Sequence, residues 1–327
     1  MPDGRMLPVL GSNNGATYRE LPCKTALNHC TSERMPFDWT LNPYRGCEFA
    51  CRYCYARYTH EFLQMAEPRL FETEVFAKLG APEALARDLA RIKDLSGGIA
   101  IGTATDPYQP AERKLLVMRK VLEVLAGAST AHRLRVSITT KSNLVTRDLD
   151  LLTAISQRHD LSVNLTITTL SRRLARRLEP RAPRPGLRLL AVRELARAGI
   201  AAGVFIMPIV PGLTDASVSL EAIIAAASRA GASHLAHQVL FLRSSTRGFF
   251  YSFLRESFPQ LLPEYRRLYE GKADGAPEYA EYHERLNALI RELRGRYGLT
   301  SRPATGVSVE PQLRLDFGQD SSAASAA

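Results

Sequence analysis

"NPYRGCEFACRYCYAR", residues 42–57, contains three of the five cysteines of the chain, at Cys47, Cys51 and Cys54. An odd number of cysteines argues against a disulfide framework. Thiols clustered in this way are more typical of metal ligands or redox groups. The spacing therefore predicts a site built on this one loop.

Three thiols on one loop leave several kinds of site open. A structural zinc ion takes four ligands, usually from two separate pairs, and the fourth would have to come from Cys23, Cys30 or His60. Three thiolates on a [4Fe–4S] cluster leave one iron without a protein ligand, so that iron can bind another molecule. Thiols without any ligand are the remaining alternative, although free cysteines seldom cluster without a chemical reason.

Beyond this loop, short β-branched runs alternate with amphipathic helical stretches. A first strand is expected around Thr40, and further strands at residues 99–103, 134–140, 161–169, 202–208 and 235–242. The helices expected between them lie at residues 82–94, 112–126, 147–157, 186–198 and 216–230. Repeated strand–helix units imply parallel strands with right-handed crossovers, and hence a doubly wound sheet or a complete or partial barrel.

The two ends of the chain differ from this alternating region. Residues 1–40 show no sustained period and predict an extended arm, and residues 41–245 form the expected central domain. Residues 246–317 are expected to form a helical region, with helices at 249–255, 264–269 and 278–297. Residues 318–327 have nothing to bury and are expected to be disordered.

Polar residues follow several of the expected strands, where parallel β/α folds carry their chemistry. "GTATDPYQPAE" supplies Thr105 and Asp106, which could accept hydrogen bonds from an ammonium group or form an Asp-Pro turn. Lys141 in "TTKSN" could pair with a carboxylate or form a surface ion pair. Glu112 is either a ligand contact or an acid in the first turn of a helix.

The segment "MPIVPGLTD" follows the strand expected at residues 202–208. Ile209 and Val210 could support a bound adenine, or the segment could simply end the strand in a Pro-Gly turn. A helix capped by Thr214 or Asp215 would then follow.

The pattern Cys-x3-Cys-x2-Cys, with Tyr53 before its last cysteine, resembles the signature of radical S-adenosylmethionine enzymes. Together with "GTATDPYQPAE", "TTKSN", "LEPRAP" and "MPIVPGLTD" it resembles the spore photoproduct lyase-like branch, over roughly residues 40–245. The resemblance implies an α/β fold, a partial (β/α)6-type barrel with an N-terminal arm and a C-terminal helical appendage. It also implies a [4Fe–4S] cluster, S-adenosylmethionine, a 5′-deoxyadenosyl radical, and an electron donor such as flavodoxin or ferredoxin.

The resemblance also assigns roles to single residues. It makes Cys47, Cys51 and Cys54 the cluster ligands, with Tyr53 against the adenine and Tyr55 near the path of the radical. The residues that it places on S-adenosylmethionine are Thr105 and Asp106 at the amino group, Lys141 at the carboxylate, Thr166 at the ribose, and Ile209 and Val210 at the adenine.

One position departs from the pattern of that branch. Spore photoproduct lyases return a hydrogen atom from a cysteine, and the corresponding residue here is Thr103. A threonine O–H is a very poor hydrogen-atom donor compared with a thiol. The resemblance therefore predicts a substrate other than the spore lesion, unless Cys23, Cys30 or Tyr55 supplies the atom.

The net charge of +10 permits a nucleic-acid partner. Only seven of the 43 basic residues are lysines, a bias that also arises from genome composition. "SRRLARRLEPRAPRPGLR" carries seven arginines between Ser171 and Arg188, which could contact DNA phosphates or form a solvated helix face. The later aromatic and basic segment "RSSTRGFFYSFLRESF" supplies either stacking residues or the core of a helix.

Three functional classes follow from these observations. The chain is a radical enzyme that acts on damaged or modified DNA, a radical enzyme that acts on a peptide or small metabolite, or a non-catalytic metalloprotein. The longest apolar run, residues 200–210, is too short to cross a bilayer, and the N-terminus lacks the order of a secretory signal. A cytoplasmic protein without a membrane partner is therefore expected.

Overall fold

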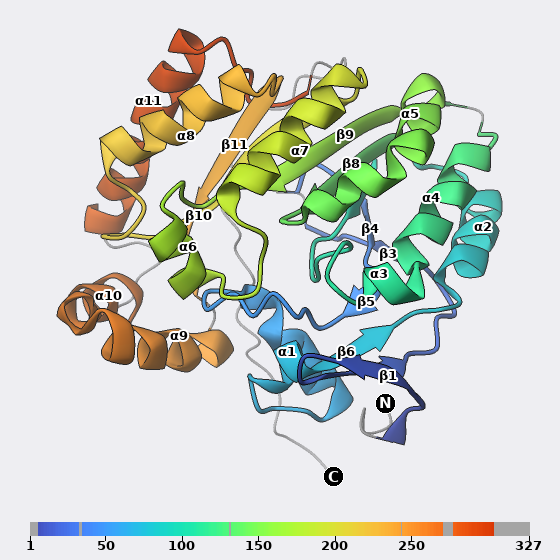
Figure 1. Cartoon of the computed structure of the whole chain (residues 1–327), viewed down its shortest axis with the longest axis horizontal. Coiled ribbons are helices and arrows are strands. Elements are labelled where there is room, and N and C mark those ends of the chain that lie inside the picture. Colours follow the sequence, from blue (N-terminus) through green and yellow to red (C-terminus); the bar gives the residue numbers. More distant parts are fainter. Residues whose placement is uncertain (1–5, 33–34, 131, 243, 271–276, 304–327) are drawn as a thin grey trace.

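The computed structural model describes residues 6–32, 35–130, 132–242, 244–270 and 277–303 (Figure 1). Its centre is a seven-stranded sheet in the order β11-β10-β9-β8-β7-β4-β3. The six strands from β11 to β4 run parallel, and β3 pairs antiparallel with β4. The strands of this sheet are β3 (Leu27–His29), β4 (Trp39–Leu41), β7 (Ile99–Ile101), β8 (Arg135–Thr140), β9 (Asp160–Thr166), β10 (Ala201–Ile209) and β11 (His234–Val239).

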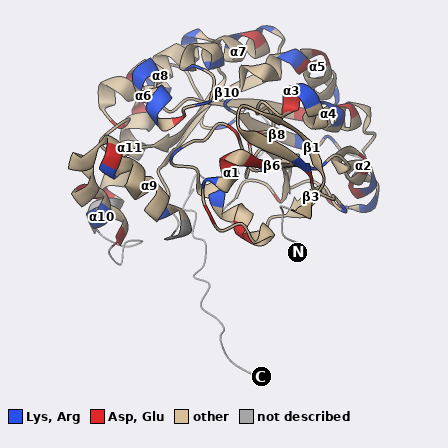
Figure 2. Cartoon of the chain, turned by 60° about the horizontal axis from the view of Figure 1, so that its bottom comes forward, with Lys and Arg blue, Asp and Glu red and all other residues tan. Residues whose placement is uncertain are grey.

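Helices cover the outer side of this sheet. In Figure 2, α8, α7, α5, α4 and α2 form an arc outside the strands. These helices are α2 (Ala81–Arg91), α4 (Val117–Gly127), α5 (Leu149–Arg158), α7 (Pro185–Arg197) and α8 (Ser217–Arg229). Since β11 and β3 end the described sheet without pairing to each other, the arrangement is an open one. The predicted α/β fold of the partial (β/α)6 type is confirmed.

Three strands end earlier than the sequence predicts. The prediction carries them to Thr103, Thr169 and Leu242, but β7 ends at Ile101, β9 at Thr166 and β11 at Val239. The residues beyond these ends include β-branched threonines, whose propensity favours a strand although they lie in the loops at the carboxyl rim. For β7 and β9 the error therefore falls on segments that carry polar side chains, whereas the residues after β11 are the apolar Leu240, Phe241 and Leu242.

The helix expected over residues 112–126 is two helices in the structure. α3 (Glu112–Leu115) and α4 are separated by Leu116, whose φ of 53° is left-handed. The helix expected from residue 147 begins as a 3-10 turn, η3 (Asn143–Asp148), before α5. α8 begins after Ala216, which has no side-chain cap, so the predicted caps Thr214 and Asp215 are wrong.

Residues 7–20 are more regular than the predicted extended arm. β1 (Val9–Asn13) and β2 (Ala16–Glu20) form a hairpin, and with β6 (Glu74–Ala77) and β5 (Tyr44–Arg45) they make a second, four-stranded sheet in the order β1-β2-β6-β5. The hairpin turn is Asn14-Gly15, and both residues have positive φ, 44° and 80°. This small sheet carries the chain directly into the cysteine loop.

The remaining helices lie around the cysteine loop and at the β11 edge. They are η2 (Tyr55–Leu63), α1 (Leu70–Thr73), α6 (Arg172–Leu178), α9 (Ser244–Ser257), η4 (Pro259–Leu261), α10 (Leu262–Glu270) and α11 (Pro277–Arg296). The helical character predicted for residues 249–255, 264–269 and 278–297 is confirmed. α11 packs on α8, where Tyr282 donates a hydrogen bond of 2.8 Å to Asp215. The predicted disordered tail, residues 318–327, lies outside the described residues.

Two large apolar clusters, and a small one that includes Leu63 and Phe76, make up the core of the described residues. The larger one fills the space between the main sheet and its outer helices. The second contains Cys47, Cys51 and Tyr53 together with Phe250 and Tyr265 from α9 and α10. α9 and α10 therefore pack over the cysteine loop rather than extending the barrel. Among the described helices, none is long and apolar enough to span a membrane.

Candidate active site

The cysteine loop begins at Gly46, a position that only glycine can occupy. Its φ is +84°, and a Cβ there would lie 2.8 Å from the carbonyl oxygen of Glu74 and 2.9 Å from that of Phe71. The next residue, Cys47, donates its backbone N–H to the Phe71 carbonyl at 2.8 Å. The start of the loop thus lies in close backbone contact with the segment formed by α1 and β6.

Gln109 fixes the loop on both sides of Cys47. Its side-chain amide donates to the Gly46 carbonyl at 3.0 Å and accepts from the Glu48 N–H at 3.0 Å. Thr105 donates to the same Gly46 carbonyl at 2.6 Å. Since both residues belong to "GTATDPYQPAE", the segment after β7 positions the first cysteine.

Two further contacts fix the middle of the loop. Arg57 donates to the Cys51 carbonyl at 3.0 Å and forms an ion pair of 2.6 Å with Glu72. The Arg52 N–H donates to the Leu178 carbonyl at 2.9 Å, at the end of α6. The loop is therefore bonded to segments from three distant parts of the chain.

All three thiols of the loop are free of disulfides, and Cys47 and Cys51 are buried while Cys54 is half-buried. Burial, then the neighbouring charges of Asp106 and Cys51, raises the pKa of Cys47 well above its usual value. Burial likewise raises the pKa of Cys51 to about 12, although Lys141 opposes the shift. Such thiols become thiolates only beside a strong positive charge, so the donor set fits an iron–sulfur centre.

Asp106 joins the end of β8 to the segment after β7. Its carboxylate accepts from the Thr140 hydroxyl at 2.6 Å, the Lys141 N–H at 2.7 Å and the Tyr108 N–H at 3.0 Å. Burial raises the pKa of Asp106, while these hydrogen bonds oppose the shift. Asp106 therefore contacts Lys141 through the Lys141 backbone N–H.

Tyr53 lies between Lys141 and a buried ion pair. The Lys141 Nζ is 5.8 Å from the Tyr53 ring centroid, and the Tyr53 hydroxyl donates to Glu179. Glu179 pairs with Arg188 at 2.5 Å, and both side chains are 1% exposed. Burial alone would raise the pKa of Glu179, but Arg188 and Lys141 lower it, so the carboxylate stays charged.

Lys141 keeps its charge for related reasons. Burial alone would lower its pKa, but the thiol of Cys51 and the carboxylates of Glu179 and Asp106 raise it. A lysine that faces a thiol, a carboxylate and an aromatic ring is unlike one in a surface ion pair. Lys141 is therefore a half-buried lysine beside the cysteine loop.

Tyr55 and Thr103 are direct neighbours. The Tyr55 hydroxyl donates to the Thr103 carbonyl, and the Thr103 hydroxyl accepts a hydrogen bond of 3.0 Å from the Asn42 side-chain amide. The side-chain oxygen of Asn42 also accepts from the Ala104 N–H at 2.8 Å. The structure thus places Tyr55, which the resemblance puts near the path of the radical, beside Thr103, which stands where spore photoproduct lyases have a cysteine.

The other predicted cofactor residues lie at or just beyond strand ends. Thr166 is buried at the end of β9, and its carbonyl accepts from Arg188 at 3.0 Å. The threonine that contacts the Tyr53 hydroxyl, at 3.2 Å, is Thr168, two positions later. Ile209 and Val210 are both fully buried, and Val210 packs in the same cluster as the cysteines.

Two of the candidates for a fourth zinc ligand, His60 and Cys23, have other partners. His60 bonds to the Glu74 carbonyl at 2.8 Å and packs against Phe71 and Phe76, and burial lowers its pKa to about 4. The Cys23 thiol donates to the Thr25 carbonyl at 3.3 Å. Across the described ranges, no three His, Cys, Asp or Glu side chains are arranged to hold a single metal ion.

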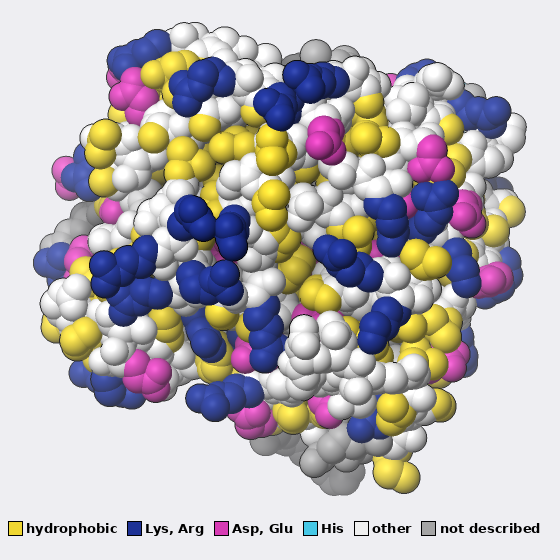
Figure 3. Space-filling model, viewed as in Figure 1, with side chains coloured by type: hydrophobic (Ala, Val, Ile, Leu, Met, Phe, Trp, Pro, Cys, Tyr) yellow, Lys and Arg dark blue, Asp and Glu magenta, His cyan; other side chains and the backbone are white. Residues whose placement is uncertain are grey.

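The arginine-rich segment forms α6 and the start of α7. Figure 3 shows Lys and Arg side chains gathered over α6 and the adjoining surface. Arg177 is an exception within this set, since it donates to the Ser257 carbonyl at 2.5 Å and stacks 4.0 Å from the Phe258 ring centroid. In the later aromatic segment, Phe250 and Phe253 are core residues, which confirms the core interpretation for them. Arg243, also in that segment, lies outside the described residues.

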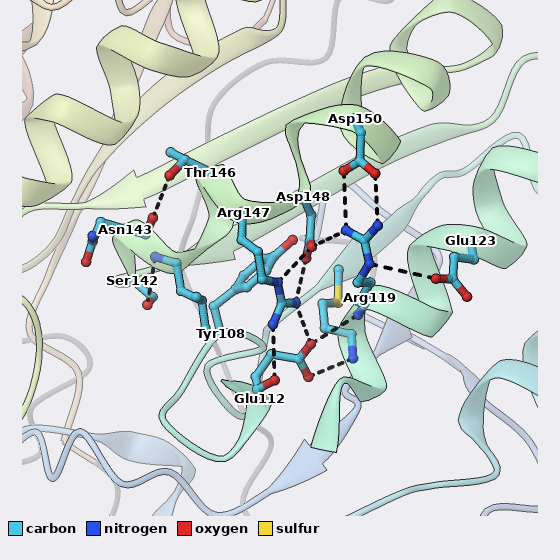
Figure 4. Close-up of polar contacts among 12 residues, drawn as sticks. Tyr108, Glu112, Arg119, Glu123, Ser142, Asn143, Thr146, Arg147, Asp148 and Asp150 are labelled. Carbon is cyan, nitrogen blue, oxygen red and sulfur yellow. Dashed lines mark hydrogen bonds and ion pairs between the residues drawn. The ribbon is translucent and has the colours of Figure 1, made fainter. Parts of the chain in front are cut away.

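Glu112 proves to be the centre of a buried polar network. Its carboxylate accepts from Tyr44 at 2.5 Å, from the Met118 N–H at 2.8 Å and from Arg147 at 2.8 Å. Figure 4 shows Arg147 between Glu112 and Asp148. Glu112 therefore joins α3, α4 and η3, a structural role that neither sequence interpretation predicts.

Sequence reasoning missed the residues that fix the cysteine loop and Tyr53 through hydrogen bonds. Gln109, Glu48, Glu179 and Arg57 lie within or beside the quoted motifs, but nothing in their spacing says which backbone group each would bind. Their common signal is a polar side chain buried among apolar ones, which is visible only once the elements are packed.

A family model described as the Radical SAM superfamily matches residues 41–220. An uncharacterized protein of Mycobacterium tuberculosis is 36% identical over 283 residues, covering 86% of this chain and 82% of that protein. An uncharacterized protein of Acidianus two-tailed virus is 30% identical over 273 residues, covering 81% of each. A structure of spore photoproduct lyase complexed with dinucleoside spore photoproduct has a similar fold, with a TM-score of 0.64 at 17% identity, covering 87% of this chain and 81% of that one.

Proposed function

Since the chain belongs to the Radical SAM superfamily, we propose that Cys47, Cys51 and Cys54 hold a [4Fe–4S] cluster and that the chain is a radical S-adenosylmethionine enzyme. The observation that carries this proposal is the set of three disulfide-free thiols on a loop that is bonded on several sides. An odd number of cysteines and the need for reduced thiols favour the cytoplasm as the location of the reaction.

Bound together, the cluster and S-adenosylmethionine supply a 5′-deoxyadenosyl radical that abstracts hydrogen from a substrate. The chain's own residues bind and orient the cofactor. Lys141, charged and facing the cysteine loop, is suited to its carboxylate, and Thr105 with Asp106 to its amino group. Tyr53 is held rigidly by Glu179 and Thr168, so its ring can support the adenine with Val210.

Asp106 has a second role in this arrangement. Its carboxylate already accepts two backbone N–H groups and one hydroxyl, so it fixes the turn that carries Lys141. Any bond that it makes to an ammonium group uses its remaining acceptor capacity. We therefore assign Lys141 the larger share of cofactor affinity.

For the substrate we propose a damaged or modified nucleic acid, most simply DNA. The support is the basic surface over α6 and the likeness of the fold to a lyase whose structures hold a dinucleoside spore photoproduct. Thr103 makes the spore lesion itself a poor match. We propose Tyr55, bonded to the Thr103 carbonyl, as the hydrogen-atom donor. Its oxygen must recover an electron, from an external donor such as flavodoxin or ferredoxin, and a proton, from solvent, before the next turnover.

The experiment compares wild-type protein, the Cys47→Ala/Cys51→Ala/Cys54→Ala variant and Lys141→Ala after anaerobic reconstitution. Iron, acid-labile sulfide and 5′-deoxyadenosine are measured with reductant and S-adenosylmethionine. The triple variant should lose all three signals. Lys141→Ala should keep its iron but bind S-adenosylmethionine more than tenfold more weakly, because one charge-assisted hydrogen bond is removed.

Cys23→Ala/Cys30→Ala is the matched control, since it removes thiols that lie outside the loop. Four irons retained by the triple variant would refute the ligand assignment, and unchanged cofactor affinity in Lys141→Ala would refute its role. Lesion-bearing oligonucleotides, added to the same mixture, test the substrate class through formation of a modified product.

A further inference from the structure

Four arginines surround one pocket between α6 and the start of α7. The pocket has a volume of about 280 Å³, and Arg172, Arg173, Arg176 and Arg184 line it. A second hollow shares Arg172 and Arg184 and reaches Gly186 in the first turn of α7. The two hollows therefore form one basic surface across the helix starts.

These four arginines lack the acidic partners that arginines have elsewhere in the molecule. In the part of the chain that the structure describes, none of the four forms an ion pair, and Arg176 makes a hydrogen bond of 3.3 Å to the Pro180 carbonyl. The Glu179 carboxylate at the pocket wall is already paired with Arg188. The positive charge of the pocket is thus left uncompensated.

The arrangement is unfavourable for the helices themselves. Arg172 and Arg173 occupy the first turn of α6, and neither α6 nor α7 has an acid in its first turn. Cations at a helix N-terminus oppose the helix dipole, and like charges four residues apart, as in Arg172 and Arg176, repel. A pocket that lowers local stability in two ways is better explained by a ligand than by solvation.

We propose that this pocket binds a phosphodiester group of a nucleic-acid strand. Arginine matches the geometry of phosphate oxygens with paired N–H donors, and the start of a thirteen-residue helix, α7, adds a favourable dipole. A carboxylate ligand would use the same donors, so an acidic peptide is the competing occupant. Four guanidinium groups around one pocket favour a ligand with several negative charges over a single carboxylate.

The position of the pocket connects it with the candidate active site. Glu179, in its wall, accepts a hydrogen bond from Tyr53, which precedes Cys54 in the cysteine loop. The Arg181 N–H, in the same connection, donates to the Phe49 carbonyl of that loop at 3.3 Å. A strand bound here would lie beside the cysteine loop. This last step rests on the proposed function, whereas binding itself does not.

The experiment measures binding of a fluorescein-labelled twelve-nucleotide single strand to the full, reconstituted chain by polarization over a range of salt concentrations. Arg172→Ser/Arg173→Ser/Arg184→Ser is compared with Arg91→Ser/Arg285→Ser/Arg296→Ser, which removes the same charge from α2 and α11. The log–log salt slope should fall by about 0.7 for each phosphate that the variant no longer neutralises, so by roughly 1.4 to 2.1 in the pocket variant. The slope of the control variant should fall by less than about 0.7.

Equal slopes in the two variants would overturn the pocket as the site, even if the wild-type chain binds the strand. A labelled oligoglutamate that binds as tightly as the strand, and loses affinity with the pocket variant, would overturn the nucleic-acid assignment. Release of the strand by millimolar inorganic phosphate, in the wild type more than in the pocket variant, supports recognition of the phosphate group. Cleavage of S-adenosylmethionine is measured separately, so failure of the pocket and failure of the proposed enzyme are distinguishable.

Discussion

The arginines beside α4 and α5 and those beside α6 and α7 are chemically identical but are used in opposite ways. Arg119 pairs with Asp148 at 2.7 Å and with Asp150 at 2.9 Å, and Arg147 pairs with Glu112 and Asp148 (Figure 4). The arginines of the α6–α7 pocket have no such partners in the described ranges. The first group fixes helices to one another, and the second leaves its charge available at the surface.

Arg188 lies with the second group in sequence but acts like the first. It belongs to the arginine-rich segment, yet it is buried and bonded to Glu179, the Pro183 carbonyl and the Thr166 carbonyl. The total charge of a segment therefore says little about function. What separates a structural arginine from a binding arginine is whether its guanidinium group already has a partner within the fold.

The largest expected effect is in Arg188→Leu. The substitution removes the ion-pair partner of the buried Glu179 carboxylate, which keeps hydrogen bonds from Tyr53 and Thr168, and we expect the free energy of unfolding to fall by about 3 to 5 kcal/mol. Urea denaturation at pH 7 measures this loss. The matched control is Arg193→Leu, an exposed position on the same helix, which should change the free energy by less than about 0.5 kcal/mol.

The same variant has a predicted pH dependence. The pKa of Glu179 is lowered in the folded chain, so the ion pair stabilises the fold above the ordinary pKa of 4.5 and loses its effect as pH falls through the folded value. The difference between wild type and Arg188→Leu should therefore shrink in acid. A difference that grows below pH 4.5 would contradict the assigned direction.

A smaller loss is expected in Arg147→Leu. Glu112 and Asp148 are fully buried, but Glu112 keeps bonds from Tyr44 and the Met118 N–H, and Arg147 is 25% exposed. We expect a destabilisation of roughly 2 to 3 kcal/mol, below the range for a fully buried pair. Thermal unfolding measures it. An effect no greater than that of Arg193→Leu would mean that Glu112 and Asp148 hold these elements together without their ion pairs to Arg147.

The smallest effect has the opposite sign. Arg173→Glu replaces a cation in the first turn of α6 by an anion, so the helix dipole should stabilise the fold by about 0.3 to 1 kcal/mol. The same substitution should weaken oligonucleotide binding. A loss of stability in urea would show that Arg173 makes a structural contribution and would remove the contrast between the two groups of arginines.

The parts of the molecule predicted from sequence are those with local patterns. The β-branched runs predict the positions of all five strands from β7 to β11. The pattern of a strand is contained within a few residues, so the sequence alone shows it. The Asn14-Gly15 turn is also a local signal. Asn-Gly is typical of a two-residue hairpin and therefore predicts β1 and β2. The short β5 and β6 carry no comparable pattern.

The site is only partly predictable for a related reason. The cysteines, Asp106 and Lys141 follow from their motifs, whereas Gln109 and Glu179 act through partners 63 and 126 residues away in the sequence. Pairing at that range depends on packing, which local propensity does not encode. The break between α3 and α4 at Leu116 is equally hard to predict. Its left-handed backbone brings the Met118 N–H within hydrogen-bond distance of the Glu112 carboxylate.

The packing of α9 and α10 over the cysteine loop has a consequence for the order of synthesis. The loop leaves the ribosome roughly 200 residues before these helices, which at about 5 to 20 residues per second is an interval of about 10 to 40 seconds. During that time Cys47 and Cys51 lack the cover of Phe250 and Tyr265. Iron and sulfide delivered to the nascent chain would reach thiols that the finished protein buries, so late delivery would require α9 and α10 to detach first.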